Sequence, residues 1–256
     1  MRMLFLGDVV GSCGRDAVVA TVPKLRRELA LDYVVANGEN IAGGRGITPA
    51  TADDLFACGV DLISGGNHTF NHREVYAYLD ETPGIVRPLN YPAGAPGHGV
   101  ATVGELTLVN VIGRAFMASD YDDPFRAVDE ALKGIPAEQF VLVDVHAEAT
   151  SEKQGMGWYL DGRVTAVVGT HTHVPTADTR VLPRGTAYCT DAGMCGARDS
   201  VIGDEIEAVL SRFLTQMPTR LPPAKGVAQL NGLLIEADDA TKRALSITRH
   251  DVVLGH

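Results

Sequence analysis

Short apolar runs alternate with amphipathic stretches in the first part of the chain. The runs have the length of buried strands, and the stretch after the first run repeats its apolar positions with the period of a helix. Strands are therefore predicted at residues 4–6, 33–36 and 62–63. A helix is predicted through Val18–Leu29, and Thr48-Pro49 is predicted to begin another, because threonine caps helices and proline favours their first position.

The second part of the chain combines a hairpin with further strands and helices. Two strand-like runs, 100–103 and 106–112, flank Gly104-Glu105, which predicts a hairpin. Further strands are predicted at residues 140–145, 164–168, 230–236 and 245–248, helices at 125–132 and 205–214, and a loop at 88–99. This alternation of strands and helices predicts an α/β fold.

Residues with metal-binding side chains follow five of the predicted strands. In chain order they are Asp8; Glu39 and Asn40; Asn67 and His68; His146; and His171 and His173. Ligands of open α/β sheets gather outside the carboxyl ends of strands, and the glycines beside these residues permit tight turns there. A ligand set of carboxylates, amides and imidazoles without thiolate suits manganese, iron or zinc. It does not suit a structural zinc site, which is built from thiolates.

The pair His171 and His173 is the most informative of these clusters. Side chains two positions apart leave the same face of a strand, so both imidazoles are expected to point at one place where the run 164–168 opens into a loop. Taken singly, the clusters also have ordinary explanations as turn residues, helix caps or core histidines. Their joint occurrence favours a metal site. Because they span residues 8–173 and would have to converge, a single domain over residues 1–256 is predicted.

Composition and charge narrow the class of protein. The formal net charge is −10, and Lys and Arg form no basic cluster, which opposes binding to long duplex nucleic acids. No apolar run approaches the ~18 residues of a membrane-spanning helix, so no membrane partner is expected. The four cysteines lack C-x-x-C spacing, which favours reduced thiols and a cytoplasmic location. A phosphate-bearing substrate would need local positive charge, which metal ions can supply.

The order of the clusters resembles the five-block signature of the calcineurin-like metallophosphoesterases. The blocks are Gly7-Asp8, Gly38-Glu39-Asn40, Gly66-Asn67-His68, His146 and Gly169-Thr-His171-Thr-His173. The chain departs from the broad family in two ways: its first block lacks histidine (Asp8-Val9-Val10), and Glu39 replaces an aspartate. In both respects it resembles the YmdB-like phosphodiesterase branch. Three longer segments also resemble that branch: Gly38–Thr48, His146–Lys153 and Thr190–Met194.

This resemblance implies a fold, a cofactor and an assembly. The fold is a four-layer α/β/β/α sandwich of the metallophosphoesterase type with mixed sheets. The cofactor is a pair of divalent or trivalent metal ions, iron with manganese as a substitute. The first ion would be held by Asp8, Glu39, Asn40 and His173, and the second by Glu39 as a bridge with Asn67, His146 and His171. Self-association into a homo-oligomer is also implied.

The same resemblance implies a phosphodiesterase of small substrates such as 2′,3′-cyclic nucleotides, with short RNA as a further candidate. Two metal ions ~3.5–4 Å apart activate a bridging hydroxide and clamp the phosphate oxygens. His68 is assigned as the general acid that protonates the leaving oxygen. The alternative is a regulatory nucleotide- or RNA-binding protein that keeps the site but turns over slowly or not at all. The intact Asn67-His68 pair favours catalysis, since a binder needs no general acid.

Four further features are weaker candidates. Arg45, in the glycine-rich segment 43–46, is either part of a flap that meets a substrate phosphate or part of a solvated loop. His72 is predicted to be a surface or outer residue, and Glu148 and Thr150 either support the metal ligands or belong to an ordinary loop. Cys195 is predicted to be a small buried residue. A metallo-β-lactamase, an amidohydrolase barrel and a serine hydrolase are disfavoured, because their motifs are absent or misplaced.

Overall fold

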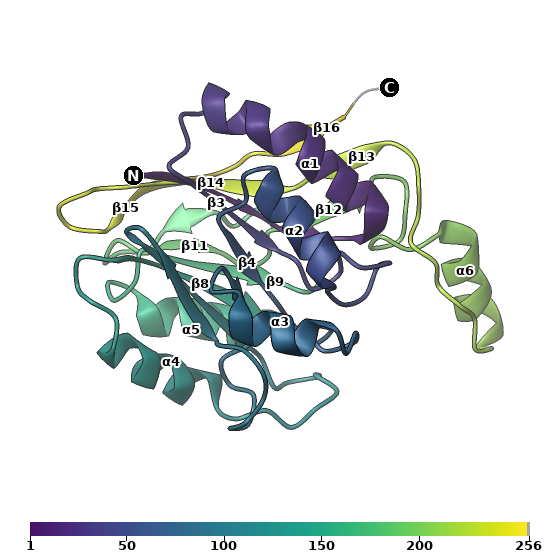
Figure 1. The fold of residues 1–256 in the computed structure, drawn as a ribbon, viewed down its shortest axis with the longest axis horizontal. Helices are drawn as coiled ribbons and strands as arrows, with labels where there is room; N and C mark the ends of the chain where they lie inside the picture. Colours follow the sequence, from purple (N-terminus) through teal and green to yellow (C-terminus); the bar gives the residue numbers. More distant parts are fainter. Residues whose placement is uncertain (255–256) are drawn as a thin grey trace.

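Two six-stranded mixed sheets packed face to face form the centre of the structure, a computed structural model that describes residues 1–254 (Figure 1). The first sheet has the order β15 (Ala244–Arg249), β14 (Gly232–Ala237), β1 (Arg2–Leu6), β3 (Tyr33–Asn37), β4 (Leu62–Ser64), β5 (Ile85–Val86). The second has the order β10 (Arg180–Val181), β11 (Ala187–Cys189), β9 (Ala166–Thr170), β8 (Phe140–His146), β7 (Leu106–Ile112), β6 (Val100–Val103).

A smaller third sheet and six helices complete the described part of the chain. The third sheet has the order β16 (Val252–Val253), β13 (Ala228–Leu230), β12 (Met194–Ala197), β2 (Asp8–Val9). The helices are α1 (Gly11–Glu28), α2 (Pro49–Ala57), α3 (Val75–Glu81), α4 (Pro124–Lys133), α5 (Thr150–Leu160) and α6 (Ile206–Thr215). Helix α6 stands away from the sheets (Figure 1).

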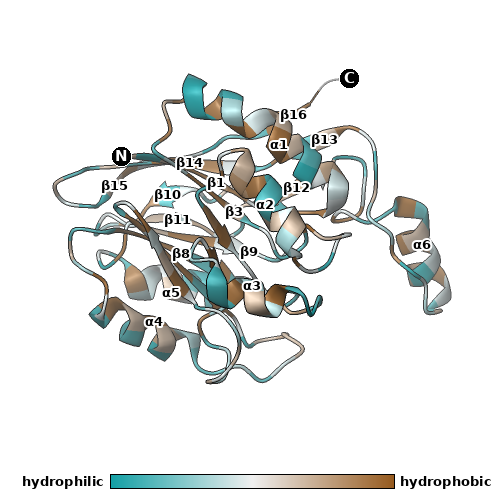
Figure 2. Ribbon diagram, in the orientation of Figure 1, coloured by the Kyte–Doolittle hydropathy of each residue, from teal (hydrophilic) through white to brown (hydrophobic). Residues whose placement is uncertain are grey.

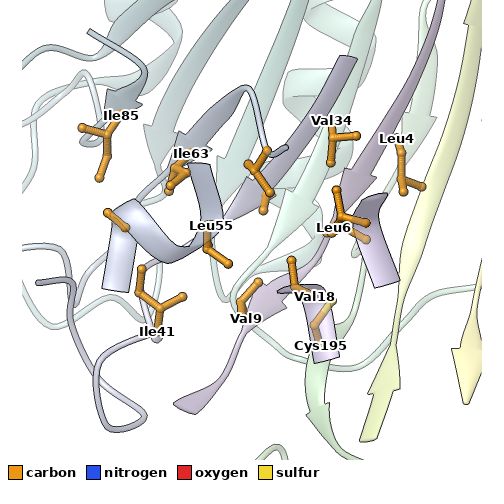
Figure 3. Close-up of a cluster of buried hydrophobic side chains, with 14 of the residues drawn as sticks. Leu4, Leu6, Val9, Val18, Val34, Ile41, Leu55, Ile63, Ile85 and Cys195 are labelled. Carbon is orange, nitrogen blue, oxygen red and sulfur yellow. The ribbon is translucent and has the colours of Figure 1, made fainter. Parts of the chain in front are cut away.

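Alternation along the strands produces three apolar layers. In β1, Met3 and Phe5 face the second sheet, whereas Leu4 and Leu6 face the other way, into a cluster with Val18 of α1 (Figure 3). A third cluster packs the second sheet against α4 and α5. Figure 2 shows the consequence, with apolar strands at the centre and helices that carry polar residues on their outer faces. The predicted four-layer α/β/β/α sandwich is confirmed.

Parallel pairing sets the position of the strand ends. Strands β1, β3, β4 and β5 run parallel to one another, as do β7, β8, β9 and β11. The carboxyl ends of neighbouring parallel strands therefore lie at one edge of their sheet. This edge carries the loops that follow β1, β3, β4, β8 and β9, which are the loops that hold the predicted ligands.

The structure divides one predicted strand and contains a helix that the sequence did not predict. The run 230–236 is divided at Asn231, because β13 pairs with β12 in the third sheet whereas β14 pairs with β1 in the first. Helix α5 begins at Thr150, for which the sequence allowed either an ordinary loop or a residue that supports the metal ligands. Its glycines weaken the helical signal, yet Gly157 lies directly against the ring of Tyr188, where a larger residue would collide.

The other predicted strands and helices are present with small shifts of their ends, except that α1 begins at Gly11, well before Val18. The segment 88–99 is a loop, as predicted. The helix begun by Thr48-Pro49 has the expected start, since the Thr48 side chain accepts a hydrogen bond from the Thr51 backbone. Among residues 1–254, no helix combines the length and the apolar character that crossing a membrane would require.

Candidate metal centre

Seven predicted ligands come together where the two sheets meet at their carboxyl edge. Asp8 follows β1 and pairs in the third sheet with Met194, which fixes its position beside the first sheet. Glu39 and Asn40 follow β3, and Asn67 follows β4. From the second sheet, His146 ends β8 and the segment 171–173 follows β9. The site therefore lies between the two sheets rather than on one of them.

The ligand atoms form two groups that share one carboxylate. Asp8, Glu39 and His173 bring one ligand atom each to within 4.8 Å of one another, and Glu39, His146 and His171 do the same. Glu39 is the common member, as expected of a bridging ligand. His171 and His173 belong to different groups.

Two amides complete the groups. The Asn67 side-chain oxygen lies 2.8 Å from His146 Nε2, beside the second group. The Asn40 side-chain nitrogen Nδ2 donates to Glu39 Oε1 at 2.9 Å and lies 3.2 Å from His173 Nε2, beside the first group. All seven predicted ligands are thus placed as two neighbouring sets. Their roles as ligands remain predictions.

The electrostatics of the buried carboxylates fit a cation. Asp8 and Glu39 are both shielded from solvent, and burial is the main cause that raises the pKa of Asp8 well above its usual range and the pKa of Glu39 to about 8. Asp8 Oδ1 is buried without any hydrogen-bond partner. A buried, unpaired carboxylate oxygen is costly unless a cation neutralises it. The donor set and this orphaned oxygen therefore suit metal ions.

A close approach at Gly66 preserves the space among the ligands. A side-chain carbon at this position would overlap Glu39 Oε2 and His146 Nε2. Glycine is the one residue without such a carbon, so Gly66 allows the β4 loop to pass directly beside the two ligands. The glycine next to Asn67 is therefore required by the geometry of the site.

Hydrogen bonds fix the orientation of two of the imidazoles. Thr170 donates its hydroxyl proton to Asp144 Oδ1 at 2.7 Å, so its oxygen is left to accept from His146 Nδ1 at 2.9 Å. This arrangement leaves the His146 Nε2 lone pair facing Glu39, at 3.3 Å. His173 Nδ1 likewise donates to the Ile202 carbonyl at 2.6 Å, which turns its Nε2 toward the site. Such outer contacts set the tautomer of a ligating histidine.

His171 is oriented by Glu148. Its Nδ1 lies 3.0 Å from His146 Nε2, and its Nε2 lies 3.2 Å from Glu148 Oε2. The carboxylate therefore holds the Nε2 proton and leaves Nδ1 as the ligand atom. Of the two interpretations given for Glu148, the contact with His171 fits the supporting one, whereas Thr150 begins helix α5.

The convergence of His171 and His173 has a different cause from the one predicted. Strand β9 ends at Thr170, so the alternation of a strand does not apply to the two histidines. Both instead have left-handed backbone conformations, with φ of 99° at His171 and 63° at His173. Such φ values are uncommon outside glycine and are maintained by surrounding contacts.

Asp191 supplies those contacts. It accepts hydrogen bonds from the backbone N–H and the hydroxyl of Thr172, at 3.2 and 2.8 Å. Lys153 in turn pairs with Asp191 at 2.7 Å, and both side chains are almost fully buried. The buried ion pair thus anchors the loop between the two histidines.

Sequence reasoning missed four supporting residues: Asp144, Lys153, Thr170 and Asp191. A signal existed for Asp144, a charged residue inside an apolar strand and two positions before His146, hence on the same strand face. Burial raises its pKa to about 6. Lys153 and Asp191 lie in the segments that carry the family resemblance, but nothing in the sequence indicates that they pair.

The ligands open into a pocket of about 300 Å³. His68 and Arg45 line it, beside Asn40, His171 and His173. The His68 backbone N–H donates to Glu39 Oε2 at 2.9 Å, which places His68 next to the bridging carboxylate. Its Nδ1 contacts the Asn71 amide at 3.2 Å. Burial, followed by the charge of Arg45, lowers the pKa of His68 to about 4.

Two other candidates lie outside the pocket lining. His72 Nε2 contacts the Arg45 carbonyl at 3.1 Å, so it touches the glycine-rich loop and no ligand. Cys195 is buried in β12, and burial raises the pKa of its thiol to about 12, so it is protonated at neutral pH. Both placements agree with the outer and buried roles predicted for them.

A four-layer sandwich with carboxylates, amides and imidazoles at the strand ends defines the metallophosphoesterase type of protein. Comparison with known families identifies the branch. The family described as YmdB-like protein matches residues 4–250. The chain belongs to this family.

Known relatives are similar to this protein over nearly the whole chain. A Bacillus subtilis protein named 2′,3′-cyclic-nucleotide 2′-phosphodiesterase is 46% identical, over 97% of this chain and 96% of that protein. A Mycoplasma pneumoniae protein named putative phosphatase/phosphodiesterase is 33% identical, over 96% and 90%. A crystal structure of a hypothetical protein from Thermus thermophilus has a TM-score of 0.92 at 47% identity, covering 99% of each chain. The structure of a Mycoplasma pneumoniae phosphatase also has a TM-score of 0.92, at 33% identity, over 99% of this chain and 93% of that one.

Proposed function

We propose that this protein is a metal-dependent phosphodiesterase that hydrolyses small phosphodiesters, 2′,3′-cyclic nucleotides among them. The observation that carries the proposal is the sharing of Glu39 between two groups of ligand atoms, in a pocket that also contains His68. The name of the Bacillus subtilis relative, which is 46% identical, supports the substrate class.

Two metal ions are the proposed cofactor, iron with manganese as a substitute. Asp8, Glu39, Asn40 and His173 would hold the first. Glu39, Asn67, His146 and His171 would hold the second. When bound, the ions would supply Lewis-acid activation of the phosphate and of the attacking water. Oxygen and nitrogen donors without thiolate suit this choice of metals.

The side chains of the pocket have three tasks. His68 holds the proton that the leaving oxygen needs. In the structure its low pKa keeps it neutral, and a negatively charged phosphate beside it would raise that pKa, because a nearby opposite charge favours the protonated form. Arg45 faces the same pocket and would orient the phosphate by charge-assisted hydrogen bonds. Glu148 and Thr170 keep His171 and His146 in position.

Hydrolysis of two substrates tests the proposal. Purified protein loaded with iron or manganese should cleave bis(p-nitrophenyl) phosphate and 2′,3′-cyclic AMP, and chelation should abolish both activities. Elemental analysis should find about two metal ions per chain, since the ligand atoms form two groups. Tight nucleotide binding without turnover would instead favour the regulatory binding protein.

The remaining expectations are also proposals. The ligands come from residues 8–173 on both large sheets, which supports one domain over residues 1–256 as the catalytic unit. The cysteines Cys13, Cys58, Cys189 and Cys195 are free thiols, in keeping with a cytoplasmic location. Turnover of oligonucleotides tests short RNA as a substrate. Light scattering tests assembly into a homo-oligomer.

A further inference from the structure

A second cavity, of about 290 Å³, adjoins the metal pocket on the side of helix α6. The two cavities share Gly44, Arg45 and Asp204 in their walls. Arg45 therefore lies at the boundary, where it faces both the ligand groups and the second cavity. A ligand that begins among the metal ligands can extend past Arg45 into this space.

Three separate segments bring an arginine to the second cavity. Arg45 comes from the glycine-rich loop after β3, Arg212 from α6, and Arg220 from the segment that follows α6. The loop and that segment are in direct contact, because a side-chain carbon at Gly44 would lie only 2.5 Å from Pro223 Cγ. Gly44 also has a φ of 90°, a conformation that glycine adopts without strain.

Arginines outnumber carboxylates in the wall of this cavity. Among residues 1–254, no carboxylate lies within 4.0 Å of the guanidinium nitrogens of Arg45, Arg212 or Arg220. Of the residues that the structure describes, Asp204 is the one acidic residue that lines the cavity. In a chain with a net charge of −10, this grouping of unpaired arginines stands out. It favours an anionic ligand.

The chemistry of the wall fits a phosphate. A guanidinium binds phosphate through two parallel hydrogen bonds, and Thr219 adds a hydroxyl beside the arginines. A 2′,3′-cyclic mononucleoside phosphate has a single phosphate, which the metal pocket would take, and it would leave the second cavity empty. A strand of nucleotides has another phosphate next to the scissile one.

We propose that the cavity between Arg45, Arg212 and Arg220 is a second phosphate subsite, and that the substrate class is a short oligoribonucleotide whose neighbouring phosphate occupies it. This inference rests on the proposed phosphodiesterase function and deepens it. The subsite selects substrates that carry a second phosphate next to the scissile one, whereas the reaction takes place in the metal pocket.

Substrates that differ only in the second phosphate test the subsite. We compare 2′,3′-cyclic AMP with the same nucleotide carrying a 5′-phosphate, and with a dinucleotide ending in a 2′,3′-cyclic phosphate. The wild-type protein should have a kcat/KM roughly tenfold higher for the two substrates that carry a second phosphate. The variant Arg212→Gln/Arg220→Gln should lose this preference and keep its activity toward 2′,3′-cyclic AMP. Arg126→Gln, an exposed arginine of α4, is the matched control and should retain the preference.

Each other outcome overturns the proposal. Equal kcat/KM values for all three substrates in the wild type would remove the subsite, and so would an equal loss on all three in the double variant. A preference for the 5′-phosphate without one for the dinucleotide would rule out the oligonucleotide assignment.

Direct binding separates this inference from the proposed function. If the metal-loaded protein cleaves none of the substrates, calorimetry with adenosine 3′,5′-bisphosphate and with AMP still tests the subsite. The bisphosphate should bind more tightly to the wild type, and the double variant should lose that advantage. Equal affinities in both proteins would overturn the subsite whatever the activity.

Discussion

Glu39 and His146 face each other across the two sheets, with Glu39 Oε2 3.3 Å from His146 Nε2. Glu39 follows β3 of the first sheet, and His146 is the last residue of β8 in the second. The two residues lie far apart in the sequence, and they meet because parallel strands of both sheets end at the same edge. Metal ions held between them would therefore link the two halves of the sandwich.

Replacement of Asp8 by asparagine should remove metal and activity without unfolding the protein. Asp8→Asn takes away the buried carboxylate whose Oδ1 has no hydrogen-bond partner, so we expect metal content to fall. Turnover should drop by more than about a hundredfold, because the loss of a contact that only supports a ligand already costs about 10- to 100-fold. Elemental analysis and turnover of bis(p-nitrophenyl) phosphate measure both effects.

The melting temperature of the metal-free protein is the control for this substitution. Because burial disfavours the charged form of Asp8, the neutral amide should leave the metal-free protein as stable as the wild type or more stable. Asp16→Asn, on the exposed face of α1, should change neither metal content nor turnover. Full activity in Asp8→Asn would contradict the assigned ligand role.

Removal of His68 should affect substrates according to their leaving group. His68→Ala keeps all seven predicted ligands, so metal content should be unchanged. Turnover of 2′,3′-cyclic AMP should fall by about 10²–10⁴-fold, because its alkoxide leaving group needs a proton. Turnover of bis(p-nitrophenyl) phosphate should fall much less, because nitrophenolate leaves without one.

The leaving-group comparison distinguishes acid catalysis from a structural role for His68. His72→Ala is the matched control, since His72 contacts the Arg45 carbonyl and no ligand. Equal losses of turnover on the two substrates in His68→Ala would contradict the assignment of His68 as general acid. The proposed metal site would not be affected by that result.

Replacement of Thr170 by valine should weaken metal binding through His146. Thr170→Val removes the hydroxyl that accepts from His146 Nδ1 and donates to Asp144. We expect metal affinity to fall about 10- to 100-fold, measured by competition with a chelating dye. Thr165→Val removes a buried hydroxyl from the start of the same strand region, where it contacts the Val141 N–H. It should lower stability without changing metal affinity.

The stability of the metal-free protein should fall as the pH rises from about 6.5 to 8. Burial raises the folded-state pKa of Glu39 to about 8, and the pKa of Asp8 also rises, whereas unfolded carboxyls titrate near 4. A group with a raised folded pKa binds its proton more tightly in the folded state, so stability is lost as the pH increases toward that pKa. One carboxyl contributes at most about 2 kcal/mol over this interval.

The histidines act in the opposite direction, mostly below that interval and to a smaller extent at its lower end. Burial lowers the pKa of His68 to about 4 and also lowers the pKa of His146 and of His171. Their contribution to stability therefore grows as the pH rises and levels off about one pH unit above the unfolded value of ~6.5, so it offsets only part of the decline. Melting temperatures in EDTA at pH 6.5 and 8 check the prediction. The metal-loaded protein should lack the decline, because metal replaces the protons. An unchanged melting temperature in EDTA would contradict the raised pKa of Glu39.

Local patterns in the sequence were enough to predict many of the elements and to single out the candidate ligands. Short apolar runs record which segments will be buried, so they predicted β3, the β6–β7 hairpin and β8 closely. The cap signal Thr48-Pro49 predicted the start of α2. The glycine-flanked ligands could be recognised because carboxylates, amides and imidazoles at strand ends have few other joint purposes. The burial of Cys195 was predicted from the general tendency of free cysteine to be buried.

The way in which distant segments support one another is visible only in the folded chain. The two histidines of 171–173 converge through left-handed backbone that the Lys153–Asp191 pair anchors, and no local pattern encodes a contact between residues 38 positions apart. Asn231 divides a continuous apolar run because its two sides join different sheets. The arginines of the second cavity come from distant segments, so their shared charge arises only when the chain has folded. Sequence patterns report burial along a segment, whereas a site depends on which segments meet.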